Sequence, residues 1–189
     1  MARPIEKRDT IVRSALEVFV EKGVDGTTIQ DIANHANAAG GTLYRYFRSK
    51  EELAQSIFFE NLSLFMSELK KAILKEKHTK QKLYAMVDKF YNFFENDKVL
   101  YSYLLLSEHN FAKKMTKNYQ TPVDLIIEVI NNGVAKKEIF SKDSVFAAAF
   151  VYGAVVRITY FKIYGRIHED LSIYKNRVVE GCWAFLQNE

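Results

Sequence analysis

The 189-residue chain contains only two prolines, Pro4 and Pro122, and the stretch of more than a hundred residues between them has none. Proline removes a backbone hydrogen-bond donor and breaks the interior of a helix, so its absence is compatible with long helices. Apolar residues recur at spacings of three and four, whereas the alternation typical of a half-buried strand is absent at any length. The sequence therefore predicts an all-α protein with about nine helices.

Capping residues, glycines and apolar spacing predict the helix boundaries. Lys113–Gln120 is expected to be irregular or weakly helical. Ser141 or Ser144 is expected to cap the helix predicted at 145–164. The longer predicted helices span residues 5–22, 50 to about 77, 79–95, 99 to about 111, 122 to about 135, 145–164 and roughly 171–186.

Composition is typical of a soluble globular chain of one or two domains, with 48% hydrophobic residues. The longest apolar run, Val145 to Val156, is too short to span a bilayer and ends at Arg157. No apolar segment follows the first basic residues, so no signal peptide is expected. Cys182 is the only cysteine, which excludes an intramolecular disulfide and is compatible with a reducing compartment. These features predict a cytoplasmic protein.

Two short helical patterns joined by a turn of small residues lie between Thr27 and Leu53. Thr28 can cap the first, because its hydroxyl can accept a free backbone N–H. The apolar residues Ile29, Ile32, Ala33 and Ala36 then recur on one face, and Asn37 follows, a residue that tolerates the left-handed conformation where a helix ends.

The second pattern runs from Gly40 to Phe47. Leu43 and Phe47 are four residues apart and can both face inward, which leaves Thr42, Tyr44 and Arg45 on the outer face. Ser49 and Glu52 then form a capping box that starts another helix. A helix, a tight turn and a short helix with an exposed polar and aromatic face is the arrangement of a helix-turn-helix.

These residues also resemble a known family. The run from Thr28 to Leu53 is similar to the N-terminal motif of the TetR family of bacterial transcription regulators, and the resemblance covers roughly residues 5–65. The matching positions are Ile32, Ala33, Ala36, Gly41, Thr42, Leu43, Tyr44, Tyr46, Phe47, Ser49, Lys50, Glu51, Glu52 and Leu53. The sequence departs from the family at Asn37–Gly40, where Gly-Val-Ser and often Lys are usual, so this turn has fewer side chains available for contact with DNA.

The resemblance implies a helix-turn-helix DNA-binding domain over residues 5–65, with its motif at 28–47, and a helical effector-binding and dimerisation domain over 66–189. It implies a ligand-responsive regulator, a repressor rather than an activator, that binds a pseudo-palindromic operator in double-stranded DNA. It would act in the cytoplasm and lie on the nucleoid when operator-bound. In the family the last two helices of each subunit form a four-helix dimer interface, and small residues such as Gly153 in this chain would allow close helix packing.

The resembled motif implies which residues contact DNA. The two glycines of the second pattern allow the backbone to approach the duplex, and Thr42 and Tyr44 can reach base edges in the major groove. Arg45, Tyr46 and Lys50 are better placed for phosphates, as is Thr28 at a helix N-terminus. The alternative is that these are ordinary surface residues. The full predicted set is Thr28, Gly40, Gly41, Thr42, Tyr44, Arg45, Tyr46 and Lys50.

Charge alone does not predict DNA binding. Residues 1–56 contain eight Lys or Arg and eight Asp or Glu, so the excess of +4 lies entirely downstream. Nucleic-acid-binding proteins usually carry a basic patch. The neutral charge, with Ala39 and Gly40 in the turn, supports an alternative function: a helical ligand-binding or adaptor protein with a weakened or lost DNA-reading domain.

The sequence contains no arrangement of residues expected for catalysis or for a metal site. The four histidines, His35, His78, His109 and His168, lie on different predicted elements without a neighbouring ligand set. No glycine-rich phosphate loop or nucleophile elbow is present. The protein is therefore expected not to be an enzyme and to need no cofactor.

Aromatic residues are concentrated in the second domain, where 22 of the 26 lie beyond residue 57. They predict either a filled core or a cavity for a lipophilic or aromatic effector. Arg157 interrupts an apolar run, so it is paired, faces a cavity or interface, or lies at the solvent rim, with Glu108 as a possible partner. The predicted effector residues are Phe65, Phe90, Phe94, Tyr101, Tyr103, Glu108, Phe111, Tyr152, Arg157 and Phe161.

Overall fold

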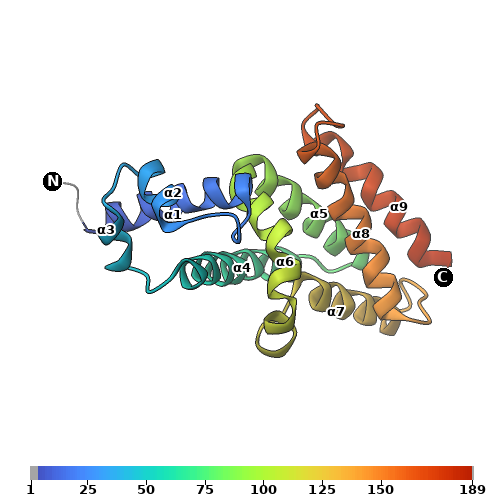
Figure 1. Ribbon diagram of the computed structural model, residues 1–189. Coiled ribbons are helices and arrows are strands. Elements are labelled where there is room, and N and C mark those ends of the chain that lie inside the picture. The colour runs from blue at the N-terminus through green and yellow to red at the C-terminus, as the bar shows by residue number, and fades with distance from the viewer. Residues whose placement is uncertain (1–3, 189) are drawn as a thin grey trace. The chain divides into compact units, whose positions relative to one another are not determined.

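The computed structural model describes residues 4–188, with side chains for residues 7–111 and 119–188. This part of the chain forms nine α-helices, one 3-10 helix and no strand, which confirms the predicted all-α class (Figure 1). The elements are α1 (Pro4–Lys22), α2 (Ile29–His35), α3 (Gly40–Tyr44), α4 (Lys50–Leu74), α5 (Thr79–Asn96), α6 (Lys98–Asn118), α7 (Pro122–Ala135), α8 (Ser144–Ile163), η1 (Leu171–Tyr174) and α9 (Lys175–Asn188).

Residues 113–120 were expected to be irregular or weakly helical, and most of the segment is helical. Helix α6 continues to Asn118. Lys113, Lys114, Met115 and Lys117 are strong helix formers, so propensity maintains the helix after the apolar spacing has ended. Helix α4 ends earlier than expected, at Leu74.

The expected serine cap of α8 is also wrong. Asp143 is the N-cap, and its carboxylate accepts hydrogen bonds from the backbone N–H groups of Val145 and Phe146, both at 3.0 Å. Ser144 is the first helical residue, and its hydroxyl donates to Asn131 Oδ1 at 2.7 Å. A carboxylate is a stronger acceptor than a hydroxyl for the free N–H groups at a helix start.

Internal contacts divide the chain into two compact units, residues 1–63 with 99–112, and residues 64–98 with 113–189. Helix α4 therefore contributes residues to both, and most of α6 belongs to the first unit. The expected domains, 5–65 and 66–189, placed residues 99–112 in the second domain, whereas in the structure these residues belong to the first unit.

The core of the first unit is formed by apolar residues of α1 and of the helix-turn-helix. Leu16, Phe19, Ile32, Leu43 and Phe47 are buried, whereas Ile29, the first residue of α2, is half-buried. Helix α6 adds Tyr103, whose ring stacks on Phe19 with 5.8 Å between centroids.

Tyr103 also binds the backbone of α4. Its hydroxyl donates to the carbonyl oxygen of Ala54 at 2.7 Å. Burial raises the pKa of this phenol, so it stays a neutral hydrogen-bond donor throughout the usual pH range. Helix α6 is thus fixed to both α1 and α4.

In the second unit, α5 packs against α7, η1, α8 and α9, and α7 packs along α8 (Figure 1). One face of α5 is polar and binds the C-terminal elements. Asp88 and Asn92 accept hydrogen bonds from Lys175 Nζ at 2.6 and 2.9 Å, and Glu95 accepts the backbone N–H of Leu171 at 3.0 Å. Because the lysine is buried, losing Asp88 would leave its charge uncompensated.

The start of α5 is held by Glu138, which lies after α7. Its carboxylate accepts the backbone N–H of Thr79 at 2.6 Å and lies 3.1 Å from His78 Nδ1. Hydrogen bonds from the Thr79 side chain and backbone lower the pKa of Glu138 from 4.5 to about 2.

Replacing Glu138 with glutamine is expected to lower the melting temperature at neutral pH, because the variant loses a carboxylate that the fold binds in its charged form. A depressed pKa contributes stability above the unfolded value of 4.5, which is lost as the pH falls toward about 2. Thermal melts followed by circular dichroism should show the difference between the two proteins shrinking across this window. A difference that stays constant down to pH 2.5 would contradict the assignment.

Helix α8 forms over almost the same residues as the helix predicted at 145–164. The apolar run Val145–Val156 is only part of it, and the whole helix, which continues past Arg157 to Ile163, is long and apolar enough to cross a membrane by length and composition. One third (33%) of its apolar window is buried in the protein. Cys182, on α9, is 2% exposed, and burial raises the pKa of its thiol to about 11.

Candidate functional site

The turn of the helix-turn-helix follows α2. The N–H of Ala38 donates to Ala33 O at 2.9 Å, and Asn37 has a φ of 48°. Asparagine is one of the few residues that adopts this left-handed conformation readily. Ala39, at the N-cap of α3, makes no side-chain hydrogen bond there.

Helix α3 presents one buried and one open face. Leu43 and Phe47 are buried, and the N–H of Phe47 donates to Leu43 O at 3.0 Å. On the open face Tyr44 is 60% exposed. A side chain added at Gly41 would meet nothing within 4 Å. The inward pair and the outward Tyr44 and Arg45 are therefore as predicted, whereas Thr42, also expected on the outer face, is half-buried.

The other predicted DNA contacts on and beside α3 vary in exposure. Gly40 is half-buried, and a Cβ there would lie 3.4 Å from Gln30 Oε1. Thr42 and Tyr46 are half-buried, and Arg45 is exposed. Arg45 is thus free of the core and available to solvent.

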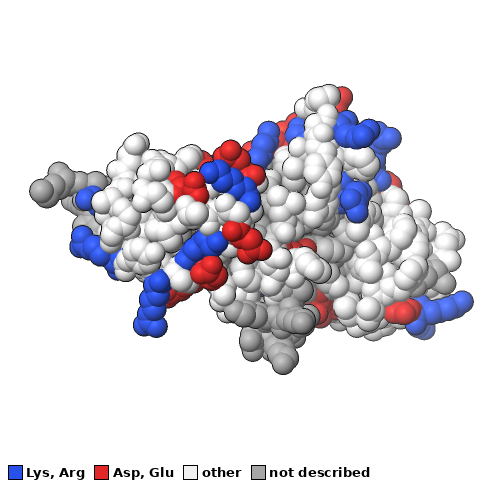
Figure 2. All heavy atoms as spheres, viewed as in Figure 1, with Lys and Arg blue, Asp and Glu red and all other residues white. Residues whose placement is uncertain are grey.

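Ion pairs engage much of the basic charge of this unit. Arg8 lies 3.3 Å from Glu60, Arg13 lies 3.0 Å from Glu17, and the Lys22–Asp31 pair spans 2.9 Å. Figure 2 shows acidic and basic side chains interleaved over this part of the surface. Among the described residues of this unit, three basic side chains are recorded without an acidic partner: Lys7, Arg45 and Arg48.

Thr28 caps α2 as expected. Its hydroxyl accepts the N–H of Asp31 at 3.1 Å and donates to the Asp31 carboxylate at 2.6 Å, which completes a capping box. The Thr28 side chain and the Lys22 ammonium hold the pKa of Asp31 well below its usual range. Thr28 is therefore next to a carboxylate, which opposes the phosphate contact expected of it.

Lys50 has partners other than the expected phosphate. Its Nζ donates to the carbonyl oxygen of Thr27 at 2.8 Å and lies 3.4 Å from that of Asp25 and 3.8 Å from Glu51 Oε1. Its side chain is 17% exposed. The ammonium is held against the loop before α2 instead of extending into solvent.

The predicted effector residues are divided between the two units. Tyr101, Tyr103, Glu108 and Phe111 belong to the first unit, where Phe111 packs on Phe58 with 4.6 Å between centroids. Phe65, Phe90, Phe94, Tyr152, Arg157 and Phe161 belong to the second.

Three of the second set come together in an aromatic cluster. The ring of Phe90, on α5, lies 4.9 Å from Phe65 of α4 and 6.1 Å from Tyr152 of α8. Phe93, which is absent from the predicted set, stacks on Phe65 with 5.0 Å between ring centroids. Its position three residues after Phe90 was the signal that could have identified it.

The polar anchor expected at Arg157 is exposed. Its guanidinium lies 5.3 Å from the centre of the Tyr160 ring on the same helix. Phe161 is also exposed. Neither residue therefore lies in an enclosed cavity, and Arg157 matches the solvent-rim alternative.

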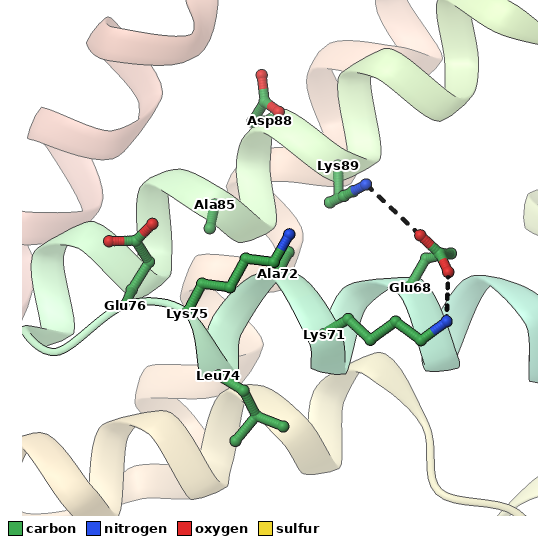
Figure 3. A pocket seen from close by; sticks show the side chains of 9 residues that line it. All are labelled: Glu68, Lys71, Ala72, Leu74, Lys75, Glu76, Ala85, Asp88 and Lys89. Atoms are coloured by element: carbon green, nitrogen blue, oxygen red, sulfur yellow. Dashed lines mark hydrogen bonds and ion pairs between the residues drawn. The ribbon is translucent and has the colours of Figure 1, made fainter.

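Two hollows in the second unit lie beside the end of α4. One, of about 470 Å³, is bordered by α4 and α5, and in it Glu68 lies 2.9 Å from Lys71 and 3.8 Å from Lys89 (Figure 3). The other, of about 360 Å³, has Leu125 and Val129 of α7 among its lining residues. Neither is lined by a residue of the predicted effector set.

An exposed apolar face runs along α8 and onto α9. Phe146 and Phe150 are 57% and 45% exposed, and Phe150 stacks on Phe185 of α9 with 3.9 Å between centroids. A Cβ at Gly153, on the same helix, would meet nothing within 4 Å. Large apolar surfaces of this kind mark sites of association.

Residues 11–57, from α1 into the first turns of α4, match the family model of bacterial regulatory proteins of the tetR family. This part of the chain belongs to the TetR family. The predicted resemblance is confirmed, and the family is one of transcription regulators, not of enzymes.

Relatives extend the TetR similarity over almost the whole chain. A fatty acid metabolism regulator protein of Bacillus subtilis is 25% identical over 187 residues, which cover 95% of each protein. The solved structure of FadR from Bacillus subtilis in complex with stearoyl-CoA has a TM-score of 0.73 at 21% identity, covering 94% of this chain and 98% of that one. AibR in complex with isovaleryl coenzyme A and operator DNA has a TM-score of 0.74 at 20% identity, covering 96% and 98%.

With this TetR-family segment, the chain is a transcription regulator. Regulators of this family are dimeric, and the exposed face of α8 and α9 is the surface on which that pairing was expected. The predicted DNA-contact set contains neither Lys7 nor Arg48. A net charge of zero over residues 1–56 does not distinguish basic side chains that pair with acids from those that do not, so it could not identify these two residues.

Proposed function

We propose that this protein is a dimeric repressor whose α3 helices read a pseudo-palindromic operator and whose release from DNA is triggered by an acyl thioester of coenzyme A. The observation that carries the DNA-binding role is the open outer face of α3, where Gly41 and Tyr44 project from the buried pair Leu43 and Phe47. A helix with such a face fits the major groove, where side chains can contact base edges.

Thr42 and Tyr44 are proposed to contact bases, and Gly40 and Gly41 to allow close approach of the backbone. Arg45, Arg48 and Lys7 are proposed to contact phosphates, because no acidic partner is recorded for them among the described residues. Tyr46 flanks this surface. We assign DNA binding to residues 5–65 and effector binding and dimerisation to 66–189, with residues 99–112 supporting the former.

The two copies are proposed to pair through α8 and α9. The stacked pair Phe150 and Phe185, with Phe146 beside it, supplies exposed apolar area on a face where Gly153 allows a second helix to approach. A two-fold dimer places its recognition helices about one DNA turn apart, which accounts for the expected pseudo-palindrome.

Two observations support an acyl thioester as effector. The relative that covers 95% of the chain is named as a regulator of fatty acid metabolism, and the FadR and AibR structures hold acyl coenzyme A molecules. The cluster of Phe65, Phe90, Phe93 and Tyr152 supplies apolar surface against which an acyl chain can pack. Each buried CH₂ contributes about 0.8 kcal/mol, so longer chains should bind more tightly until the site is full.

Acyl-CoA molecules of increasing chain length are expected to release the protein from its operator at progressively lower concentrations, by up to about fourfold per CH₂. The operator is first selected from a random DNA pool. Release is then followed by fluorescence anisotropy together with the emission of Trp183. Coenzyme A alone should have no effect.

A pair of variants tests the location of the site. Phe65→Ala should raise the concentration needed for release and leave operator affinity unchanged. Phe140→Ala, which removes an exposed ring outside the cluster, should change neither. Release that does not depend on chain length, or equal behaviour of the two variants, would exclude the acyl site.

A second function is supported by the balanced charge of residues 1–56 and by Ala39, which provides no cap to α3. It is the helical ligand-binding or adaptor protein with a weakened DNA-reading domain. Enrichment of one motif from the random DNA pool would exclude it, whereas ligand binding without any enriched motif would favour it. Association with the nucleoid belongs to the repressor function alone.

A further inference from the structure

The first residue of α4 is a lysine, and its position needs a physical explanation. The N-terminus of a helix carries partial positive charge, so a cation in the first turn is unfavourable there. Lys50 nevertheless lies at this position with its side chain 17% exposed. Something in the fold must therefore stabilise the ammonium.

The neighbouring Glu51 carboxylate lies 3.8 Å from the ammonium, and the groups that bind it by hydrogen bonds are two backbone carbonyls of the loop between α1 and α2. Lys50 Nζ donates to Thr27 O at 2.8 Å and lies 3.4 Å from Asp25 O. Hydrogen bonds from a charged donor are stronger than those between neutral groups. The two carbonyls lie more than twenty residues before Lys50 in the sequence, so these contacts join α4 to a distant loop.

The same loop is held from its other side by Thr27. The Thr27 side chain is buried, and its hydroxyl donates to Gly23 O at 2.6 Å, immediately after the end of α1. The next residue, Thr28, is the N-cap of α2. A contact on the Thr27 carbonyl therefore acts at the point where the helix-turn-helix begins.

We propose that Lys50 is a positioning residue that fixes the α1–α2 loop to the first turn of α4 and thereby sets the orientation of the helix-turn-helix. The proposal rests on the proposed operator binding. In this proposal Lys50 does not contact a DNA phosphate. Its effect on DNA recognition is exerted through Thr27 and α2, whose placement determines where the side chains of α3 meet the bases.

The test compares Lys50→Met with Arg48→Met. Methionine keeps the apolar stem of either side chain and removes every donor. Arg48 is exposed and close in sequence, so its loss removes a charge that can contact phosphate without touching the loop. Operator and non-specific DNA affinities are measured for both variants across a range of salt concentrations.

Lys50→Met is expected to lower operator affinity ten- to a hundredfold, to lower non-specific affinity much less, and to keep the wild-type salt dependence. Arg48→Met should weaken binding to both DNAs alike and reduce the slope of log affinity against log salt by about 0.9 per subunit, or about 1.8 for the dimer. Lys50→Arg, which keeps donors and charge, should restore operator affinity.

A measurement without DNA separates positioning from phosphate contact. In Lys50→Met, backbone amides of residues 24–32 should exchange with solvent faster than in the wild type, whereas Arg48→Met should leave them unchanged. Local unfolding of this segment in Lys50→Met would also support the proposal, because a phosphate ligand contributes nothing to the DNA-free protein.

Two results would overturn the proposal: a salt slope reduced in Lys50→Met as in Arg48→Met, or unchanged amide exchange in the free variant. Failure of the proposed function is a separate outcome. In that case the wild type enriches no DNA motif, and amide exchange alone decides whether Lys50 holds the loop.

Discussion

Replacing Gly41 with leucine is expected to abolish operator binding and to leave the fold intact. Glycine costs a helix up to about 1 kcal/mol relative to alanine, and a Cβ here meets nothing within 4 Å, so the substitution should not destabilise the free protein. In the complex, the side chain would occupy the space between α3 and the bases. We expect a loss of at least about a hundredfold in affinity, or about 3 kcal/mol.

The measurement is operator affinity by anisotropy, together with a thermal melt and light scattering of the free protein. The melting temperature should equal or exceed that of the wild type, and the protein should stay dimeric. The operator affinity of Gly41→Ala should lie between those of the wild type and Gly41→Leu, because the added methyl group occupies little of the interface. A Gly41→Leu protein that binds its operator with wild-type affinity would show that α3 does not face DNA.

Replacing Gly153 with leucine is expected to produce a monomer. Gly153 lies on the exposed face of α8 among large apolar side chains, and a Cβ there meets nothing within 4 Å of the same chain. The isolated subunit should therefore tolerate the leucine, whereas a second α8 could no longer approach closely. Light scattering at micromolar concentration should report the monomer mass.

Loss of the dimer should also lower operator affinity, since one recognition helix reads only half of the site. Gly41→Leu and Gly153→Leu serve as controls for each other. Both add the same side chain to an exposed helical glycine. Gly41→Leu should no longer bind the operator but should stay dimeric, whereas Gly153→Leu should be monomeric with α3 unaltered. A dimeric Gly153→Leu protein would place the interface elsewhere.

The helix-turn-helix could be predicted because its determinants are local. The Thr28 cap, the left-handed Asn37 and the inward pair Leu43 and Phe47 are all specified within a few residues of each other, and the structure shows each of them. Local patterns also gave the faces of α3, because side-chain direction on a helix follows from spacing alone.

The partners of Lys50 and the location of α6 could not be predicted, because both depend on contacts between distant segments. A lysine in a known motif carries no sign that its ammonium meets two carbonyls more than twenty residues away. The apolar residues of α6 fit either unit equally well by spacing. The contact between Tyr103 and Ala54 assigns the helix to the first.

The buried thiol of Cys182 offers a direct way to observe the regulator change shape. It is the only cysteine, it is 2% exposed, and its pKa of about 11 keeps it protonated and unreactive near neutral pH. A cysteine introduced at the exposed Arg45 could therefore be spin-labelled selectively, with one label per recognition helix. The distance between the two labels would report the separation of the helices with and without effector. It could be compared with the roughly 34–36 Å between successive major grooves.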